Sequence, residues 1–358
     1  MKPDIDLRAS RWRAQESGQR TVERIMGGER FYIFGLTKYG KSVAKFARDV
    51  GRTALNSFDG ISVVRTESIA AATAPLIINA VVESRPYSVD LFLLGKGFFA
   101  STSYFHLHAY NNAAFPLPFA AHNMLDIDNR LSAYAALEET LADATSKKEW
   151  RAVQYSRYSM DYLTGQLRYR LEEQYWEPEI YDISKKGHFI DGGCYDGNTS
   201  REFARRNPKY QKISAFAPIS LNMEKAQVNL SGCRDVDFYP LALHKDMAVR
   251  TFSENHSASG ITVNGDIAVP CAPLDSIMEG KPVHFLKLDV EGSELVALEG
   301  AQNTIRQHVP TIAICVYHDQ RYFLEIPKTI LSWVPEYRLY FRHYTEGIFE
   351  SVMYFEKG

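Results

Sequence analysis

The stretch from Phe189 to Gly197 constrains the fold of this chain more than any other feature of its sequence. An apolar run leads directly into Asp191, and three glycines follow within the next six residues. In a parallel α/β sheet, ligands bind where strands end, and glycine lets the backbone come close to a ligand. The stretch therefore predicts a strand, a tight turn and a helix that begins near Thr199.

Alternating strand and helix patterns continue from this stretch to the end of the chain. Apolar runs of strand length occur at 188–191, 213–216, 236–239, 283–288 and 311–317, and helical spacing begins at 199 and 221 and covers 294–307 and 326–333. Shorter strands are expected at 249–252 and 267–269, and a closing pair at 337–342 and 349–355. Five strand–helix units and a late antiparallel hairpin predict a doubly wound α/β sheet in a domain that covers residues 179–358.

A smaller pattern of the same kind lies nearer the N-terminus. Short apolar strands are expected at 31–34, near Phe58 and at 76–79, and an amphipathic helix follows the first of them. This pattern predicts a Rossmann-like α/β domain over residues 29–126, preceded by a polar lead-in at 1–28 that is either a short helix or disordered. Residues 127–178 have helical spacing, with Leu163, Leu167, Leu171 and Tyr175 repeating every four residues, and predict a helical connector.

The overall composition is that of a globular protein and excludes some classes of partner. Hydrophobic residues make up 45% of the 358 residues and the formal net charge is −2, so no basic surface for nucleic acid is expected. The four cysteines are too far apart for a CxxC pair and predict reduced thiols. Because the polar N-terminus lacks the apolar core of a signal peptide and the longest apolar stretch is interrupted, we expect a cytoplasmic protein without a membrane span. Oligomerisation stays open.

A second cluster of chemically active residues follows the predicted strand at 283–288. Asp289 and Glu291 come directly after this strand, and Glu294 opens the next helix, where a negative charge stabilises the helix N-terminus. Because parallel strands end at the same edge of a sheet, Asp289 and Glu291 are expected to face the same site as Asp191. The alternative interpretation is that these acids only cap the helix.

The spacing of the glycines narrows the class of ligand. The glycines after Asp191 do not have the GxGxxG spacing of a dinucleotide site, and no lysine followed by serine or threonine completes a P-loop. A carboxylate at the strand end suits a ligand with a cationic amine and hydroxyl groups better than one with a pyrophosphate. S-adenosylmethionine has both features, although a turn that merely packs a helix on a strand could have the same sequence.

Several motifs occur in order along the C-terminal half of the chain. They are Phe189 to Gly197, Leu274-Asp275, Lys287 to Glu294 with Leu298 and Gly300-Ala301, Pro310, Tyr317-His318, Ile326-Pro327, Tyr337, Arg342-His343-Tyr344 and Glu350-Ser351-Val352. Over residues 175–357 the chain therefore resembles the FkbM family of methyltransferases. The resemblance implies a class I methyltransferase fold, S-adenosylmethionine as the cofactor, and O-methyl transfer, often to sugars or other small metabolites.

The resemblance also implies which residues contact the cofactor. They are Asp191, Gly192, Gly193, Tyr195, Gly197, Pro218, Asn222, Ala242 and Asp289. One position departs from the family pattern, because the second strand normally ends in Phe-Glu-Pro, whose glutamate holds the ribose hydroxyls, and here alanine stands at position 217. Losing a hydrogen bond to a charged acceptor typically costs about 1.5–3 kcal/mol, so Ala217 predicts weaker cofactor binding unless Ser220 and Asn222 substitute in part.

Three residues are candidates for catalysis at the acceptor side of such a site. His318, at the end of the fifth strand, is the first candidate for a general base, a role that typically adds about 10²–10⁴-fold to the rate. Asp289 and Glu291 are the other candidates. The alternative role for His318 is that of a hydrogen-bonded structural histidine, and His343, on a late strand, is expected to pack.

The N-terminal domain gives fewer signals. His106 and His108 alternate as on one face of a strand, and His122 is near in sequence, but no carboxylate or cysteine completes a ligand set, so no metal site is predicted. The turn from Gly35 to Gly40 follows a strand, yet Thr37 replaces the middle glycine of a nucleotide-binding loop. A scaffold or substrate-presenting role for this domain is therefore at least as well supported as a dinucleotide site.

The sequence leads to one main hypothesis and two competing ones. The main hypothesis is an S-adenosylmethionine-dependent O-methyltransferase that modifies a hydroxyl of a saccharide or small metabolite, and Asp191, Asp289 and Glu291 favour it. The second is a degenerate methyltransferase-fold protein with a binding or assembly role and weak or no cofactor binding, which Ala217 favours. The third is a nucleotide-sugar oxidoreductase built on the N-terminal domain.

Overall fold

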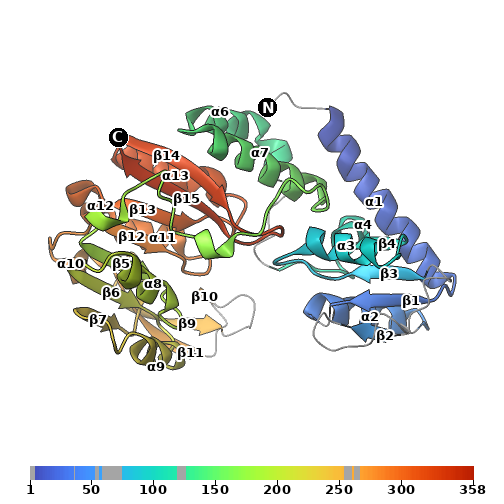
Figure 1. Cartoon of the computed structure of the whole chain (residues 1–358), viewed down its shortest axis with the longest axis horizontal. Coiled ribbons are helices and arrows are strands. Elements are labelled where there is room, and N and C mark those ends of the chain that lie inside the picture. The colour runs from blue at the N-terminus through green and yellow to red at the C-terminus, as the bar shows by residue number, and fades with distance from the viewer. Residues whose placement is uncertain are drawn as a thin grey trace. The chain divides into compact units, whose positions relative to one another are not determined.

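A computed structural model describes residues 5–35, 37–52, 56–58, 75–118, 126–253, 260–261 and 267–358. The chain forms two compact units (Figure 1). The first unit contains Met1–Ala135, Lys148–Leu171 and His343–Glu350, and the second contains Ala136–Lys147, Glu172–Arg342 and Ser351–Gly358. Each unit is therefore assembled from three separate stretches of the chain, and the range predicted as a helical connector supplies residues to both.

The first unit is built around a small parallel sheet with the strand order β2-β1-β3-β4. Its strands are β1 (Phe31–Phe34), β2 (Asn56–Phe58), β3 (Leu76–Asn79) and β4 (Ser101–Ser103), and its helices include α1 (Ile5–Met26), α2 (Lys38–Asp49), α3 (Pro86–Gly95), α4 (Tyr104–Tyr110) and α5 (Asp126–Asn129). Every pairing in this sheet is parallel. The residues of β3 are all buried because α/β units cover both faces of a parallel sheet. The predicted lead-in at 1–28 contains the helix α1, and the predicted strands 31–34 and 76–79 have the predicted bounds.

The second unit contains a seven-stranded sheet with the order β14-β15-β13-β12-β5-β6-β7. Figure 1 shows this sheet running from β14, drawn in red, to β7, drawn in olive. The strands are β5 (His188–Gly192), β6 (Lys212–Phe216), β7 (Val236–Tyr239), β12 (Phe285–Leu288), β13 (Thr311–Cys315), β14 (Tyr337–His343) and β15 (Ser351–Lys357). The five strands from β13 to β7 are parallel, and β15 is antiparallel to β13. The predicted mixed α/β fold with a mainly parallel sheet is confirmed.

The order of strands in this sheet marks a place for a ligand by topology alone. From β5 the chain proceeds outward through β6 and β7, and it then returns to the other side of β5 to form β12 and β13. The direction of winding therefore reverses between β5 and β12. Ligands in doubly wound sheets bind outside the carboxyl ends of the strands at such a reversal. The residues that follow β5 and β12 are those from Gly193 and from Asp289 onward.

Helices connect the strands of the second unit. They are α8 (Asn198–Arg206), α9 (Ser220–Asn229), α10 (Leu274–Met278), α11 (Glu294–Glu299), α12 (Gln302–His308) and α13 (Tyr322–Trp333), with short 3-10 helices η4 (Leu171–Glu173) and η5 (Ile183–Lys185). The helix predicted over 294–307 is interrupted between α11 and α12. A Cβ atom on Gly300 would lie 2.2 Å from the carbonyl oxygen of His244. Glycine is therefore required where this break approaches the neighbouring backbone.

A separate four-stranded sheet lies between β7 and β12 in the sequence. It has the order β10-β9-β11-β8 and consists of β8 (Ala242–Leu243), β9 (Ala248–Ser253), β10 (Gly260–Ile261) and β11 (Ile267–Ala272). The short strands predicted at 249–252 and 267–269 belong to this sheet and pair with each other. These strands form a sheet of their own and do not belong to the strand–helix alternation of the seven-stranded sheet.

The helical pattern predicted over 127–178 holds only in part. Helices α6 (Leu131–Thr140) and α7 (Ala144–Ser159) form as expected, but the repeat of Leu163, Leu167, Leu171 and Tyr175 does not form a helix. Met160 and Tyr175 have positive φ angles of 59° and 68°, and a left-handed residue ends a right-handed helix. The four-residue repeat of large apolar side chains indicates which residues are buried and not a helix, since Leu167 and Tyr175 are both buried.

Among the residues that the structure describes, no helix has both the length and the apolar composition that crossing a membrane requires.

Candidate functional site

The glycine turn after β5 lies directly against the end of β12. Gly193 has a φ of +80°, and a Cβ atom there would lie 1.9 Å from the carbonyl oxygen of Asp289. Only glycine meets both conditions, so the turn can touch the segment that follows β12. Gly197, also at φ +80°, precedes the first residue of α8. Between them Tyr195, at φ 49°, presents a side chain that is 62% exposed.

Asp191 is buried, and both of its carboxylate oxygens lie next to polar neighbours. Its Oδ2 accepts a hydrogen bond of 2.7 Å from Ser200 Oγ, and its Oδ1 lies 3.1 Å from Lys287 Nζ. The strand register pairs Lys287 of β12 directly with Asp191 of β5. We predicted that Asp191 would face the ligand, but the structure instead places its carboxylate beneath the glycine turn. Asp191 therefore supports the turn from inside the sheet.

Lys287 is a functional residue that the sequence analysis missed. Its ammonium also donates a 2.8 Å hydrogen bond to the carbonyl oxygen of Gly193. Burial by itself lowers the pKa of Lys287, but the charges of Asp191 and Asp289 more than reverse this and raise that pKa overall. The lysine thus stays charged and ties β5, the glycine turn and β12 together. A lysine in the middle of a buried apolar strand was the signal for it, because such a charge needs a partner.

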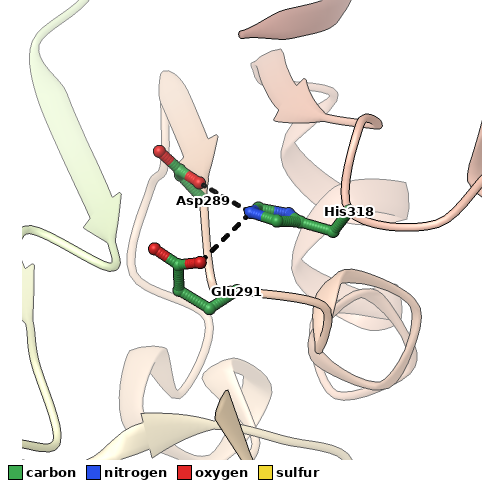
Figure 2. A group of neighbouring side chains, drawn as sticks. All are labelled: Asp289, Glu291 and His318. Atoms are coloured by element: carbon green, nitrogen blue, oxygen red, sulfur yellow. Dashed lines mark ion pairs between the residues drawn. The ribbon is translucent and has the colours of Figure 1, made fainter. Parts of the chain in front are cut away.

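Asp289, Glu291 and His318 come together at the carboxyl ends of β12 and β13 (Figure 2). The Nε2 atom of His318 lies 3.4 Å from Glu291 Oε2 and 3.8 Å from Asp289 Oδ1. The His318 side chain is completely buried, whereas those of Asp289 and Glu291 are 22% and 45% exposed. The three predicted catalytic residues are therefore neighbours, because β12 and β13 are adjacent in the sheet.

Two further side chains, those of Glu294 and Tyr175, fix the positions of His318 and Asp289. Glu294 is completely buried, and its Oε1 lies 2.9 Å from His318 Nδ1 while accepting a 3.0 Å hydrogen bond from the backbone N–H of Val290. Tyr175 donates a hydrogen bond of 3.1 Å from its hydroxyl to Asp289 Oδ2. The sequence predicted Glu294 only as an acid at a helix N-terminus. Its contact with His318 requires the fold, because 24 positions separate the two residues.

The charge state of His318 follows from these neighbours. Burial lowers the pKa of the ring, but the charge of Glu294 and the hydrogen bonds to Glu291 and Glu294 raise it well above its ordinary value. A protonated imidazole donates a proton and does not accept one. In this arrangement Asp289 and Glu291 are therefore better placed than His318 to accept a proton from a substrate.

The remaining predicted cofactor residues lie beside β6 and on the small sheet. Pro218 and Asn222 are half-buried at the end of β6 and on α9, and Ala242 is half-buried on β8. Ala217 is buried in an apolar cluster with Cys194, Ala215, Met223 and Ala226. The position at which the family resemblance implies a glutamate is therefore filled by packing, and the backbone N–H of Ala217 donates to the Tyr239 carbonyl at 3.2 Å.

The histidines of the first unit have structural surroundings. His106 and His108 lie on the helix α4, not on a strand as predicted. Ser103 caps this helix by accepting a hydrogen bond from the N–H of Phe105, which explains why a sequence rich in aromatic residues is helical here. His106 Nδ1 contacts Ser17 Oγ at 3.1 Å, and His108 Nδ1 contacts the carbonyl oxygen of Phe115 at 2.8 Å. His122 lies outside the described residues.

The glycine turn of the first unit is closed by its own neighbours. Tyr39 donates a 2.7 Å hydrogen bond from its hydroxyl to Glu83, and Lys38 forms an ion pair with the same carboxylate at 3.5 Å. A Cβ atom on Gly40 would lie 2.0 Å from the carbonyl oxygen of Gly35, so this glycine serves the packing of α2 against its own turn. Glu83 thus brings a negative charge next to Lys38 and Tyr39, which disfavours a phosphate group beside them.

Comparisons with known proteins bear on the second unit above all. The model of the methyltransferase FkbM domain family matches residues 191–345. The resemblance to FkbM methyltransferases is confirmed. The crystal structure of methyltransferase FkbM from Methylobacillus flagellatus KT matches with a TM-score of 0.72 at 18% identity, covering 98% of this chain and 99% of that one. At this identity the match shows a shared fold over both units.

Other similarities are more remote. A putative rRNA-methylase from Clostridium thermocellum matches with a TM-score of 0.36 at 8% identity, covering 54% of this chain and 99% of that one. A likeness at this level carries no inference about the present chain. No curated protein matches the sequence. Residues 191–345 thus match a methyltransferase family model, and the chain shares its fold with a solved methyltransferase FkbM.

Proposed function

We propose that this protein is an S-adenosylmethionine-dependent O-methyltransferase that acts on a hydroxyl group of a saccharide or small metabolite. The observation that carries the proposal is the contact of Gly193 with Asp289 at the point where the winding of the sheet reverses. The turn expected to hold the cofactor thereby touches the first of the three residues expected to meet the acceptor. A methyl donor on one side and a hydroxyl on the other would be held close together, and such proximity supplies much of the rate.

The residues at this edge fit a cationic cofactor. Asp289 and Glu291 present partly exposed carboxylates beside the glycine turn, while the charge of Asp191 is matched by Lys287. Carboxylates favour a ligand that carries a sulfonium and an ammonium group. When bound, S-adenosylmethionine supplies an activated methyl group, so the protein contributes binding and orientation. We propose that Gly192, Gly193, Tyr195, Gly197, Pro218, Asn222, Ala242 and Asp289 form its site, supported from beneath by Asp191.

We assign Glu291 and His318 to the side of the site that meets the methyl acceptor. Glu291 is the most exposed of the three and is placed to accept the proton of the hydroxyl group that is methylated. His318 orients both carboxylates through its Nε2 atom and is itself fixed by Glu294. Saccharides and small metabolites that carry hydroxyl groups are the acceptor class that the family resemblance implies.

A degenerate, non-catalytic protein is the competing function. It is favoured by Ala217, because a buried alanine cannot hold the ribose hydroxyls that a glutamate would hold. In that case the fold would serve binding or assembly, and S-adenosylmethionine would bind weakly or not at all. The network of Asp289, Glu291 and His318 would then have no acceptor to act on.

Calorimetric titration of the full chain with S-adenosylmethionine and S-adenosylhomocysteine separates the two functions. The enzyme predicts saturable binding of both compounds, and transfer of an isotope-labelled methyl group to at least one member of a panel of saccharides. Absence of binding at millimolar ligand would favour the degenerate protein.

A matched pair of variants tests where the cofactor binds. Asp289→Asn keeps the shape of the side chain but removes its charge, and we expect it to weaken binding of S-adenosylmethionine clearly. Asp235→Asn makes the same change before β7, at the amino edge of the sheet, on a side chain that is 62% exposed. It should leave binding unchanged, and equal effects of the two variants would contradict the assignment.

A further inference from the structure

We propose that Asp289, Glu291 and His318 bind a divalent cation of the Mn²⁺ class through Asp289 Oδ1, Glu291 Oε2 and His318 Nε2. Each of the three residues offers one ligand atom, and these atoms all lie within 4.8 Å of one another. Figure 2 shows the three side chains pointing toward one another from the segments after β12 and β13. Binding of the cation does not depend on the proposed methyl transfer, whereas its part in catalysis rests on that proposed function.

The distances suit a single ion. A cation that lies about 2.0–2.2 Å from each ligand holds two ligand atoms no more than about 4.4 Å apart. His318 Nε2 is 3.4 Å from Glu291 Oε2 and 3.8 Å from Asp289 Oδ1, both within this limit. The ligand atoms of Asp289 and Glu291 lie within 4.8 Å of each other, and the 45% exposed Glu291 side chain has room to close any excess over the limit. Among the described residues no donor makes a hydrogen bond to Asp289 Oδ1, although this atom is buried. The oxygen that faces the imidazole is thus available as a ligand.

The surroundings of His318 are those of a metal-binding histidine. Metal-bound histidines commonly donate the N–H of their second ring nitrogen to a carboxylate, which fixes the tautomer and the ring orientation. Glu294 Oε1 lies 2.9 Å from His318 Nδ1, and both side chains are completely buried. This contact directs Nε2 toward Asp289 and Glu291. Tyr175 holds the other oxygen of Asp289 in the same way, through its hydroxyl.

The charge of the cluster also favours a cation. Asp289, Glu291 and Glu294 contribute three carboxylates, while Lys287 is engaged with Asp191. A histidine that binds a metal is neutral, so a bound ion would replace any proton on His318 Nε2 and would meet three carboxylates with no other cation in the group. A divalent ion would offset most of this negative charge, and Glu291, 45% exposed, gives it a route from solvent.

The ligand types narrow the class of ion and its possible use. Carboxylates suit Mg²⁺, Ca²⁺ and Mn²⁺, whereas imidazole suits transition metals, so a site with both favours Mn²⁺ or a neighbouring first-row ion. Three protein ligands on one side leave coordination positions for water or a hydroxyl oxygen. If the proposed function holds, the ion would bind the acceptor hydroxyl and make its proton easier to remove, and that proton would pass to the oxygen of Glu291 that does not bind the ion.

The test uses the full-length chain after treatment with a chelator, and Mn²⁺ alone as the probe. Electron paramagnetic resonance of the free ion during titration should show one bound Mn²⁺ per chain. Pulsed measurements on the bound ion should detect coupling to an imidazole nitrogen, and this coupling should vanish in His318→Gln. Glu291→Gln, at an exposed position, should weaken binding about tenfold or more. Glu224→Gln, on the exposed face of α9, is the control and should leave binding unchanged.

The outcomes are decisive in both directions. Absence of stoichiometric binding at millimolar Mn²⁺, or binding without nitrogen coupling, would overturn the metal site, as would equal affinities of the wild type and Glu291→Gln. Calorimetry with S-adenosylhomocysteine, with and without EDTA, separates this result from the fate of the proposed function. Cofactor binding and methyl transfer that persist in EDTA without any Mn²⁺ binding would refute the metal alone. Nitrogen-coupled Mn²⁺ without cofactor binding would refute the methyltransferase alone.

Discussion

The two units of this protein contain the same local motif, a strand followed by a glycine turn and a helix, with different surroundings. In the first unit the turn between Gly35 and Gly40 is closed by Glu83, which accepts from Tyr39 and pairs with Lys38. In the second unit the turn after β5 rests on a buried ion pair and touches a strand end that carries further carboxylates. The glycine turn by itself therefore does not distinguish the candidate site of the second unit from the corresponding region of the first.

What distinguishes them is the residue that the neighbouring strand contributes. β12 brings Lys287 against Asp191 and then continues into Asp289 and Glu291. β3, the neighbour of β1, ends in Asn79. The Asn79 side chain donates a hydrogen bond to the carbonyl oxygen of Pro86 and accepts one from the backbone N–H of Val81. A glycine turn becomes a candidate active site only when the adjacent strand ends in groups that retain unused charge. The following predictions test this difference, beginning with the largest effect.

Lys287→Met should cause the largest loss of stability. It leaves the Asp191 carboxylate buried without its partner, and breaking a buried ion pair in this way costs about 3–5 kcal/mol. Urea unfolding of the full chain measures the effect. Lys225→Met, at an exposed position on α9, is the matched control and should change the free energy of unfolding little. A loss equal to that of the control would mean that the ion pair does not support the glycine turn.

His318→Ala should reduce methyl transfer by about 100-fold or more, the size of effect expected when a group that positions a proton acceptor is removed. The dissociation constant of S-adenosylhomocysteine should change far less, because His318 lies on the acceptor side. Steady-state kinetics and calorimetry provide the two values. His308→Ala, at the end of α12, is the control. Unchanged turnover in a working assay would remove His318 from the mechanism.

His343 should make stability depend on pH in the first unit. Burial, assisted by the charge of Arg157, lowers the pKa of His343 to about 3. An unfolded histidine has a pKa of about 6.5, so below that pH the unfolded chain binds a proton that the folded chain does not. The free energy of unfolding should therefore fall by about 2 kcal/mol from this residue between pH 7 and pH 5. Urea unfolding at both pH values should show a smaller fall in His343→Gln, and equal falls would contradict the assignment.

Tyr39→Phe should have the smallest effect. It removes one hydrogen bond to Glu83 in the first unit, and such a bond contributes about 0.5–1.5 kcal/mol to stability. Methyl transfer and the affinity for S-adenosylhomocysteine should be unchanged, since the account places both in the second unit. A clear loss of either would show that the turn of the first unit takes part in the reaction.

Much of the fold could be predicted because apolar runs and turn residues are local signals. The strands at 31–34, 76–79 and 236–239 have the predicted bounds, and Asp289, Glu291 and His318 are grouped as the ends of adjacent parallel strands require. The partners of these residues could not be predicted in the same way. Lys287 meets Asp191 only through strand register, and Glu294 meets His318 only after a helix and a strand have packed.

Other features depend on burial, which the pattern of residues does not specify uniquely. The repeat from Leu163 to Tyr175 has helical spacing but is irregular, because a left-handed Met160 ends α7 first. The short segment His343–Glu350 belongs to the first unit although both of its flanking strands belong to the second. No local signal marks such an exchange, since it depends on contacts between residues far apart in the sequence.

We propose that the carboxyl edge of β5 and β12, and not the turn of the first unit, holds the methyl donor. Hydrogen–deuterium exchange of the full chain with and without S-adenosylhomocysteine tests it most directly. We expect slower exchange of backbone amides at 192–198 and 289–293, and unchanged exchange at 37–42. Slower exchange at 37–42 without any change at 192–198 would contradict it.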